Sequence, residues 1–332
     1  MQRGYLRGAD EAMVKGTIGD SNLVLCDAHG LAYWFGAQEV TRTISPNAYV
    51  STVENMVAPS KLPVDVLERL GVRSTPIHVL VDEHKRQRFS TQVLAHLWRP
   101  PYPEKTFVRI APNVYVLSPI ACLMKASLSM SDVSILKCLY QLTGTYRYSK
   151  DGLRERPPLM TIEEAKEYLD AAQGIRGARK VRTLLNFVVD GAASPEEANV
   201  VIVLVLPGHM GGYGLPLPTM NEPVVACKAG EQEERRPDIL WKEFMLIVEY
   251  LGDEFHNRSD RFGLDAARKA HLLEAGYTVL DLTRYQTLRK NELESVVATI
   301  RKHMGLKPMR QTKEFQSKNA ELRQELFGTK TV

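Results

Sequence analysis

The chain has 332 residues, of which 44% are hydrophobic and 25% charged, so it belongs among ordinary soluble globular proteins and is long enough for two domains with buried cores. Its formal net charge of +4 permits nucleic-acid binding through a local basic face but does not argue for it. No run approaches the roughly 20 apolar residues of a membrane span, so we expect no membrane-spanning segment.

Four cysteines lie far apart along the chain, at positions 26, 122, 138 and 227. None forms a C-x-x-C pair, and the first residues, 1–4, do not begin a secretory leader. Cys26 and His29 have the separation of two metal ligands, but no second pair completes a zinc site, so both are interpreted as structural. The pattern predicts reduced thiols and a cytoplasmic location.

The N-terminal part of the chain predicts an α+β module. Two buried segments, residues 22–26 and 30–35, flank a turn, and a short helix is expected over residues 62–70. Four strands follow, separated by turn-forming Pro, Asp and Asn: residues 77–81, 93–98, 106–110 and 114–117. They predict a small mixed or antiparallel sheet, after which Ser118 caps a helix. His78 and His96 fall on these strands and are interpreted as packed or half-exposed rather than functional.

A basic segment, residues 174–182, occupies the middle of the chain. If it is helical, it presents Arg176, Arg179 and Lys180 near one exposed flank that suits phosphate groups. A solvated helical face explains the same composition without any ligand. Because the segment precedes the acidic residues considered next, contact with a DNA backbone is the functional prediction.

A helix is predicted to begin at Ser194, with serine as the N-cap, proline in the first position, and Glu196 and Glu197 in the first turn. Capping alone explains both acids. The apolar run 200–206 predicts that this helix is buried against a sheet, and Glu197 is the candidate site residue of the two. A glycine- and proline-rich stretch, residues 208–221, then predicts a compact loop; without a Gly-Lys-Ser/Thr ending, it is not a phosphate loop.

Two short strands joined by a tight turn are predicted over residues 236–241 and 245–252. Asp238 enters the first strand and Glu249 leaves the second, so antiparallel pairing would bring their side chains together. Two carboxylates about 4 Å apart repel by about 4 kcal/mol at an effective dielectric of about 20, so such a pair commonly shares a proton or a cation. The functional prediction is a hard divalent cation bound by oxygen ligands. The alternative is a solvated hairpin whose strand ends carry ordinary surface acids.

Three further elements are predicted downstream: an amphipathic helix over residues 264–276, a strand over 277–283 and a helix over 292–304. The resulting order is strand, strand, helix, strand, helix. Beyond residue 307 the chain is polar, and residues 314–327 predict an exposed helix with frayed ends.

The acidic stretch resembles the signature of the PD-(D/E)XK nuclease superfamily: Pro237-Asp238, ten intervening residues, then Glu249-x-Leu251. The following residues are similar to its very-short-patch-repair endonuclease-like branch: Gly252-Asp253-Glu254-Phe255-His256, Asp265-x-x-Arg268 and Gly276-Tyr277. The resemblance covers residues 230–290 well. It implies a restriction-endonuclease-like fold and cleavage of DNA phosphodiester bonds with Mg²⁺ or another divalent cation.

The same resemblance implies roles for individual residues. Asp238 and Glu249 would hold the cation, with Glu197 assisting directly or through water, and His256 would relay a proton. Arg268, Lys269 and the basic segment would steady the DNA backbone. Leu251 stands at the superfamily's lysine position, and leucine can neither hold a metal nor polarise a water.

The N-terminal strands carry a second resemblance. Residues 76–81, residues 115–119 and the helix after them resemble the core region of abortive-infection type antitoxin and transcriptional-regulator proteins. The sequence therefore predicts an α/β protein in three parts. These are an α+β module (1–155), a restriction-endonuclease-like domain with a central mixed sheet flanked by helices (156–308), and a polar tail (309–332).

The predicted function is that of a Mg²⁺-dependent endonuclease acting on DNA, in a defence or toxin–antitoxin setting. A catalytically inactive DNA-binding regulator that keeps the nuclease fold is the alternative, and Leu251 favours it. A structural protein that binds a partner protein from the same operon also remains open.

Overall fold

The computed structural model describes residues 14, 17–36, 48–73, 75–149, 151–228, 231–252 and 269–328. The chain divides into two compact units. Unit 1 comprises Met1–Cys138 and Arg147–Asn186, and unit 2 comprises Leu139–Tyr146 and Phe187–Val332. The predicted boundary at residue 155 differs from this division, because the helices between residues 156 and 186 group with unit 1.

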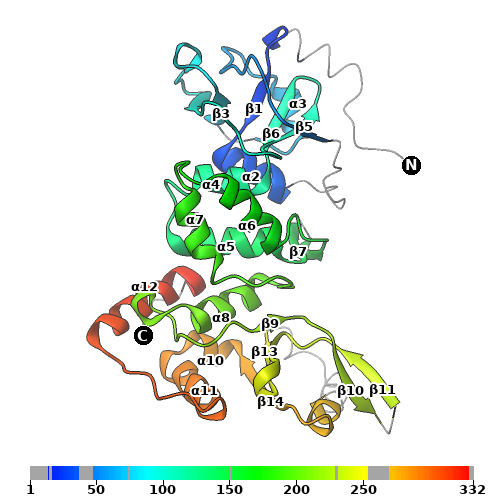
Figure 1. Cartoon of the computed structure of the whole chain (residues 1–332), viewed down its shortest axis with the longest axis vertical. Coiled ribbons are helices and arrows are strands. Elements are labelled where there is room, and N and C mark those ends of the chain that lie inside the picture. Colours follow the sequence, from blue (N-terminus) through cyan, green and yellow to red (C-terminus); the bar gives the residue numbers. More distant parts are fainter. Residues whose placement is uncertain are drawn as a thin grey trace. The chain divides into compact units, whose positions relative to one another are not determined.

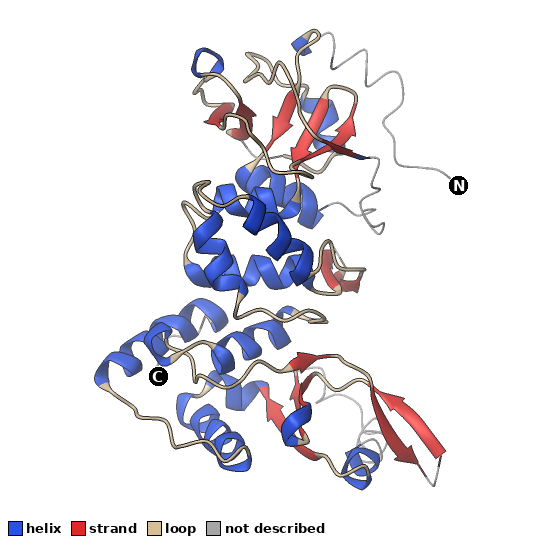
Figure 2. Cartoon of the chain, in the orientation of Figure 1, coloured by secondary structure: helices blue, strands red, loops and turns tan. Residues whose placement is uncertain are grey.

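Unit 1 contains a six-stranded mixed sheet in the order β2-β5-β6-β1-β3-β4. Figure 1 labels four of these strands, β1, β3, β5 and β6, and Figure 2 draws the strands in red. Its strands are β1 (Leu23–Leu25), β2 (Tyr49–Val50), β3 (Ile77–Val81), β4 (Val93–Leu97), β5 (Phe107–Ala111) and β6 (Val114–Leu117). β1 is parallel to β6 and antiparallel to β3, whereas β3 and β4 are parallel. The four strands predicted between residues 77 and 117 are confirmed to within one residue at each end.

Two helices, α2 (Asp27–Gly36) and α4 (Pro119–Ala126), pack against each other beside this sheet. Gly30 permits the close approach, since a β-carbon there would meet the Sγ atom of Cys122. The indole N–H of Trp34 donates to the carbonyl of Leu117 over 2.8 Å, which ties α2 to the end of β6. α2 also contacts β3, so the first residues of α2 lie beside that strand.

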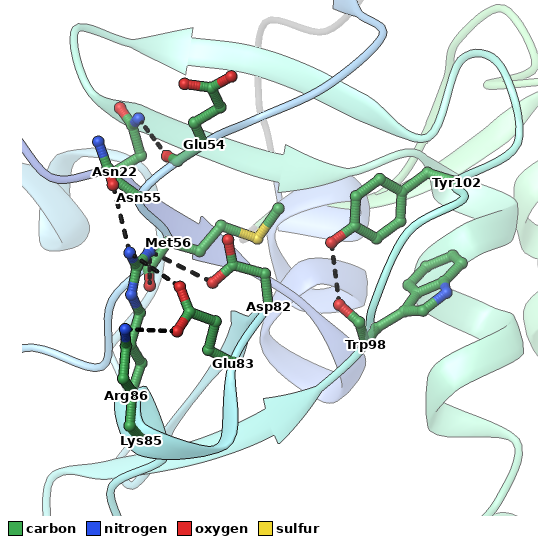
Figure 3. A network of polar contacts seen from close by, with 10 residues as sticks. All are labelled: Asn22, Glu54, Asn55, Met56, Asp82, Glu83, Lys85, Arg86, Trp98 and Tyr102. Carbon is green, nitrogen blue, oxygen red and sulfur yellow. Dashed lines mark hydrogen bonds and ion pairs between the residues drawn. The ribbon is translucent and has the colours of Figure 1, made fainter.

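Arg86 forms hydrogen bonds that hold the connection between β3 and β4 in place (Figure 3). It lies in the single helical turn η2 (His84–Arg86). Its guanidinium donates to the side chains of Asp82 and Asn55, over 3.3 Å each, and to the carbonyl of Met56 over 3.5 Å. These bonds join the connection to the segment before β3 in sequence, which fixes the two parallel strands on either side of it.

Unit 1 also contains the helices α3 (Val64–Arg69), α6 (Ile162–Ala171) and α7 (Ala178–Leu185). α6 begins with a capping box formed by Thr161 and Glu164, and both α6 and α7 contact α4. This packing on α4 explains why residues 147–186 belong to unit 1. Between α4 and α6 in the sequence lie α5 (Asp132–Thr143), which contributes to both units, and the hairpin of β7 (Tyr146–Ser149) and β8 (Gly152–Glu155).

Unit 2 is built from α8 (Pro195–Val205) and a four-stranded mixed sheet in the order β14-β13-β12-β9. The strands are β9 (Thr219–Met220), β12 (Ile239–Trp241), β13 (Leu246–Leu251) and β14 (Thr278–Thr283). β12 is antiparallel to β9 and β13, and β13 is parallel to β14. A hairpin of β10 (Val224–Lys228) and β11 (Glu231–Arg235) adds apolar side chains to the core of this sheet. The three predicted strands and the Ser194 cap of α8 are confirmed.

In the described part of the chain, the sheet is followed by α10 (Arg284–Leu288), α11 (Lys290–His303) and α12 (Lys313–Phe327). The tail helix α12, predicted to be exposed, instead packs against α8 and the short turn η3 (Gly208–Met210). Phe315, Leu322 and Leu326 are buried, and the side-chain amide of Asn319 donates to the carbonyl of Gly211 over 2.7 Å. The tail is therefore part of the core of unit 2.

The predicted fold class is confirmed, because helices flank mixed sheets. The helix predicted over residues 264–276 lies partly outside the described residues, and residues 269–274 are helical. None of the helices in the described part of the chain combines the length and apolar character that a membrane crossing requires.

Candidate acidic metal site

The facing ends of β12 and β13 bring Asp238 and Glu249 together. The register pairs Ile239 with Val248, so Asp238, one residue earlier, lies opposite Glu249, one residue later. The Oδ2 atom of Asp238 accepts a hydrogen bond from the backbone N–H of Tyr250 over 2.7 Å. The two carboxyl groups are also hydrogen-bonded to each other. The strand pairing thus produces the proximity that the sequence predicts.

Burial and neighbouring acids perturb both carboxyl groups of this pair. Burial, followed by the charges of Glu249 and Glu197, raises the pKa of Asp238 from 3.8 to about 8. Burial also raises the pKa of Glu249, with repulsion from Asp281 and Glu197 adding to the rise and hydrogen bonds at Asp238 opposing it. Both carboxyl groups therefore hold a proton to higher pH than an isolated carboxyl group does, and the two titrate as a pair.

Glu197 lies in the first turn of α8 and is only 8% exposed, whereas Glu196 is exposed. Its carboxylate accepts hydrogen bonds from the hydroxyl of Ser194 (2.8 Å), the side-chain amide of Asn221 (2.9 Å) and the backbone N–H of Ala193 (3.1 Å). Burial raises the pKa of Glu197, and these bonds oppose the rise. Capping thus accounts for its position, and burial distinguishes it from Glu196.

Asn221 links Glu197 to the strand that follows Asp238. Its side-chain amide also donates to the carbonyl of Gly191 over 3.0 Å, and its backbone N–H donates to the carbonyls of Pro237 (3.0 Å) and Asp238 (3.3 Å). Its φ of 51° lies in the left-handed region, which asparagine tolerates. Sequence reasoning placed Asn221 in a loop without a function, because its bonds span segments far apart along the chain.

A third strand adds Asp281. The parallel register places Asp281 of β14 directly beside Glu249 of β13. Nζ of Lys269 lies 2.7 Å from Oδ2 of Asp281, so this lysine, predicted to contact DNA, forms an ion pair beside the acidic site. Leu251 follows Glu249 by two positions and, by strand alternation, faces the same side. Sequence alternation offered no signal for the pairing of Asp281 with Glu249.

Asp238 and Glu249 lie next to each other, whereas Glu197 lies farther from both. Within the described residues, one set of His, Cys, Asp or Glu has all of its ligand atoms within 4.8 Å of one another, and it lies in unit 1: Asp27, His78 and His96. Glu197 does not complete such a set with the strand acids, although its charge acts on both. Of the two roles predicted for Glu197, the one through water fits this geometry.

The predicted DNA-binding residues of the basic segment all lie in unit 1. Arg176 and Arg179 are exposed. Lys180 is committed to the chain itself, since its Nζ donates to the carbonyls of Met130 (2.6 Å) and Ser127 (3.2 Å). α7 begins at Ala178, so Arg176 precedes the helix on which it was predicted to lie. Two further predicted residues lie outside the described residues: His256 and Arg268.

Comparison with known proteins adds two relatives. No family model matches the chain, and no solved structure matches it. Uncharacterized proteins from two strains of Mycobacterium tuberculosis are each 31% identical to it over 110 residues, which is 33% of this chain. The matched stretch covers 37% of each relative, so the chain spans little more than a third of their length. Their names state no activity, and the chemistry of the acidic site is therefore argued from its geometry.

Proposed function

We propose that unit 2 is a Mg²⁺-dependent nuclease that hydrolyses DNA phosphodiester bonds. The proposal rests on the hydrogen-bonded pair of Asp238 and Glu249, which lies at the ends of adjacent strands in surroundings that raise both pKa values. Holding two acids in mutual repulsion costs stability, and strongly perturbed carboxyl groups of this kind gather at functional sites. A divalent cation would remove the repulsion.

The donor set fits Mg²⁺. Asp238 and Glu249 offer carboxylate oxygens, which hard cations prefer, and they offer no nitrogen or sulfur. These two residues would hold the ion in place of the proton that they share. When bound, Mg²⁺ supplies stabilisation of the charge on a scissile phosphate and lowers the pKa of a water molecule. Glu197, fixed by three hydrogen bonds, would orient a water beside the pair.

Other residues support the same proposal by their placement. Asn221 holds the carboxylate of Glu197 and the backbone before β12 at once, so it acts as a positioning residue. Lys269 brings a positive charge to the edge of the acidic site through Asp281. His256 is the proposed proton relay, because an imidazole titrates near neutral pH.

Contacts with the DNA backbone are assigned to exposed cations. Arg176 and Arg179 are exposed in unit 1, and Arg268 belongs to the same proposal. Lys180 is withdrawn from it, because its ammonium already binds two carbonyl groups. The free thiols of Cys26, Cys122 and Cys138 suit a reducing compartment, and we place the activity in the cytoplasm.

The test is cleavage of supercoiled plasmid DNA by the full chain with Mg²⁺ and with a chelator. A double variant, Asp238→Asn with Glu249→Gln, keeps the shape of both side chains and removes their charges. The matched control is Glu243→Gln, an exposed carboxylate in the turn η4 (Lys242–Phe244) that joins the same two strands. We expect the control to cleave like the wild type and the double variant to be inactive. Equal cleavage by all three proteins would refute the proposal.

The second candidate function is a DNA-binding regulator that keeps the fold without the chemistry, in line with the antitoxin-like resemblance of unit 1. Leu251 favours it, since an apolar side chain lies beside Glu249 where a polar group would assist catalysis. Binding of DNA that weakens steeply with salt, with no cleavage at any Mg²⁺ concentration, would support the regulator. Absence of both binding and cleavage would favour a partner protein as the ligand.

A further inference from the structure

Three side chains from separate segments of unit 1 converge beside β3 and β4. Asp27 begins α2, His78 lies on β3 and His96 lies on β4. The parallel register pairs Leu80 with His96, so His78, two residues before Leu80, faces the same side of the sheet as His96. α2 contacts β3, which brings Asp27 to the two histidines.

The distances between the potential ligand atoms match the distances between neighbouring ligand atoms around a bound metal ion. Nδ1 of His78 lies 3.4 Å from Oδ1 of Asp27 and 3.2 Å from Nε2 of His96. One potential ligand atom from each of the three residues lies within 4.8 Å of the other two. Ligands about 2.05 Å from a tetrahedral Zn²⁺ ion lie about 3.3 Å apart. The two measured distances fall on either side of that value.

These contacts conflict when no cation is present. Nδ1 of His78 carries at most one proton and faces both a carboxylate oxygen and an imidazole nitrogen. If it is protonated, it can donate to only one of them with good geometry. If it is not, its lone pair faces the carboxylate of Asp27. A cation accepts a lone pair from each of the three atoms at once, so it resolves the conflict.

Hydrogen bonds fix the carboxylate of Asp27 and the backbone of His78. The backbone N–H of Ala28 donates to Oδ1 of Asp27 over 2.7 Å, and the backbone N–H of His78 donates to Nδ1 of His29 over 3.2 Å. The side chains of Asp27 and His78 are 10% and 21% exposed, so neither is fully enclosed by the protein. Orientation of ligands by neighbouring groups is a regular feature of metal sites in proteins.

We propose that Asp27, His78 and His96 bind one divalent transition-metal ion, of which Zn²⁺ is the representative. Two imidazole nitrogens and one carboxylate oxygen favour such an ion over Mg²⁺ or Ca²⁺. Three protein ligands leave a fourth position for water or a substrate, which is the arrangement of catalytic rather than structural zinc sites. The site belongs to unit 1 and does not depend on the nuclease proposal for unit 2.

One competing explanation involves Lys125 on α4. Its ammonium lies 5.6 Å from the centre of the Trp98 ring and interacts electrostatically with Asp27. If this lysine alone compensates the charge of Asp27, the two histidines need no metal. The two explanations differ in whether the protein binds Zn²⁺ at all.

The test uses the full chain carrying Asp238→Asn and Glu249→Gln, which removes both carboxylates of the acidic site of unit 2 so that this site does not bind the added metal. The protein is freed of metal by a chelator and titrated with Zn²⁺ by calorimetry and with Co²⁺ by visible absorption. We expect one ion per chain and the intense absorption of tetrahedral Co²⁺. Removing a group that hydrogen-bonds to a metal-binding side chain lowers metal affinity by about 10–100-fold. We therefore expect removal of a metal-binding side chain itself to lower the affinity for Zn²⁺ by more than about 100-fold.

The ligand variants are His96→Gln and Asp27→Asn. Asparagine can keep the hydrogen bond with Ala28 and accepts the positive φ of residue 27, so the backbone should be preserved. His84→Gln is the matched control, since His84 is a histidine elsewhere in unit 1 that bonds to Gln87. Circular dichroism of the metal-free proteins checks folding, and His96→Gln carries the test if Asp27→Asn does not fold. No binding by the parent protein, or equal binding by the parent and His96→Gln, would overturn the proposal.

Discussion

Replacing Asp238 by asparagine should stabilise the protein, and the gain should grow with pH. Asparagine keeps an oxygen that can accept from the N–H of Tyr250 and an N–H that can donate to Glu249, so both hydrogen bonds can persist. In the wild type, burial and neighbouring acids raise the pKa of Asp238 from 3.8 to about 8. The native state therefore binds more protons than the unfolded chain between these values, and stability falls as pH rises through this range.

The magnitude follows from the pKa. A rise from 3.8 to about 8 corresponds to about 6 kcal/mol at 1.36 kcal/mol per pKa unit. Asp238 is only half-buried and shares its proton with Glu249, so we expect less than half of this, about 2–3 kcal/mol. The penalty disappears well below pH 3.8, where Asp238 is protonated in both states, and reaches its full value well above pH 8, where Asp238 is ionised in both states.

The assay is urea denaturation of the wild type, Asp238→Asn and the control Glu243→Gln at pH 5, 6.5 and 8.5 with a chelator present. We expect the advantage of Asp238→Asn over the wild type to increase at each step and the control to show no such trend. A destabilised Asp238→Asn at pH 8.5, or an advantage independent of pH, would refute the reasoning. If the proposed function holds, added Mg²⁺ should narrow this difference in stability, because the ion would stabilise the native wild type and not the variant.

Three further substitutions test the packing around the two sites, each by urea or thermal denaturation. Asn221→Gly accommodates the positive φ but removes the amide that donates to Glu197, so we expect the free energy of unfolding to fall by about 1–3 kcal/mol. This loss should be larger at high pH, where the carboxylate of Glu197 is ionised. A loss that does not change with pH would argue against this role. Arg86→Met should cost about 1–2 kcal/mol by leaving Met56 and its neighbours without a donor, whereas Lys85→Met, which breaks an exposed ion pair, should be neutral. Gly30→Ala should cost about 1–3 kcal/mol by overpacking against Cys122, and a second change, Cys122→Ala, should recover part of that loss; no recovery would show that the contact is not the cause.

Local patterns in the sequence were sufficient where the interaction is local. Alternating apolar residues and a tight turn set the register of β12 and β13, and that register places Asp238 opposite Glu249. The Ser194 cap likewise located Glu197 at the start of α8. Each of these inferences depends on residues within a dozen positions of one another.

Contacts between distant segments could not be inferred in the same way. The pairing of Asp281 with Glu249 depends on a parallel crossover, and His78 and His96 meet only because β3 and β4 are parallel neighbours. Sequence reasoning assigned both histidines to packing, because neither spacing nor neighbours distinguishes a ligand from a core residue. The polar composition of residues 314–327 predicts an exposed helix, although Phe315 and Leu322 are seven residues apart and share one buried face.

The alternation of the chain between the two units has a consequence for synthesis on the ribosome. The polypeptide passes from one unit to the other at residues 138, 146 and 186. The first unit therefore stays incomplete until α7 has emerged, since α6 and α7 must return to α4. Cutting the gene at residue 155 would leave α4 without two of its helices and expose apolar surface, so a released N-terminal fragment should extend to about residue 186 to stay in solution.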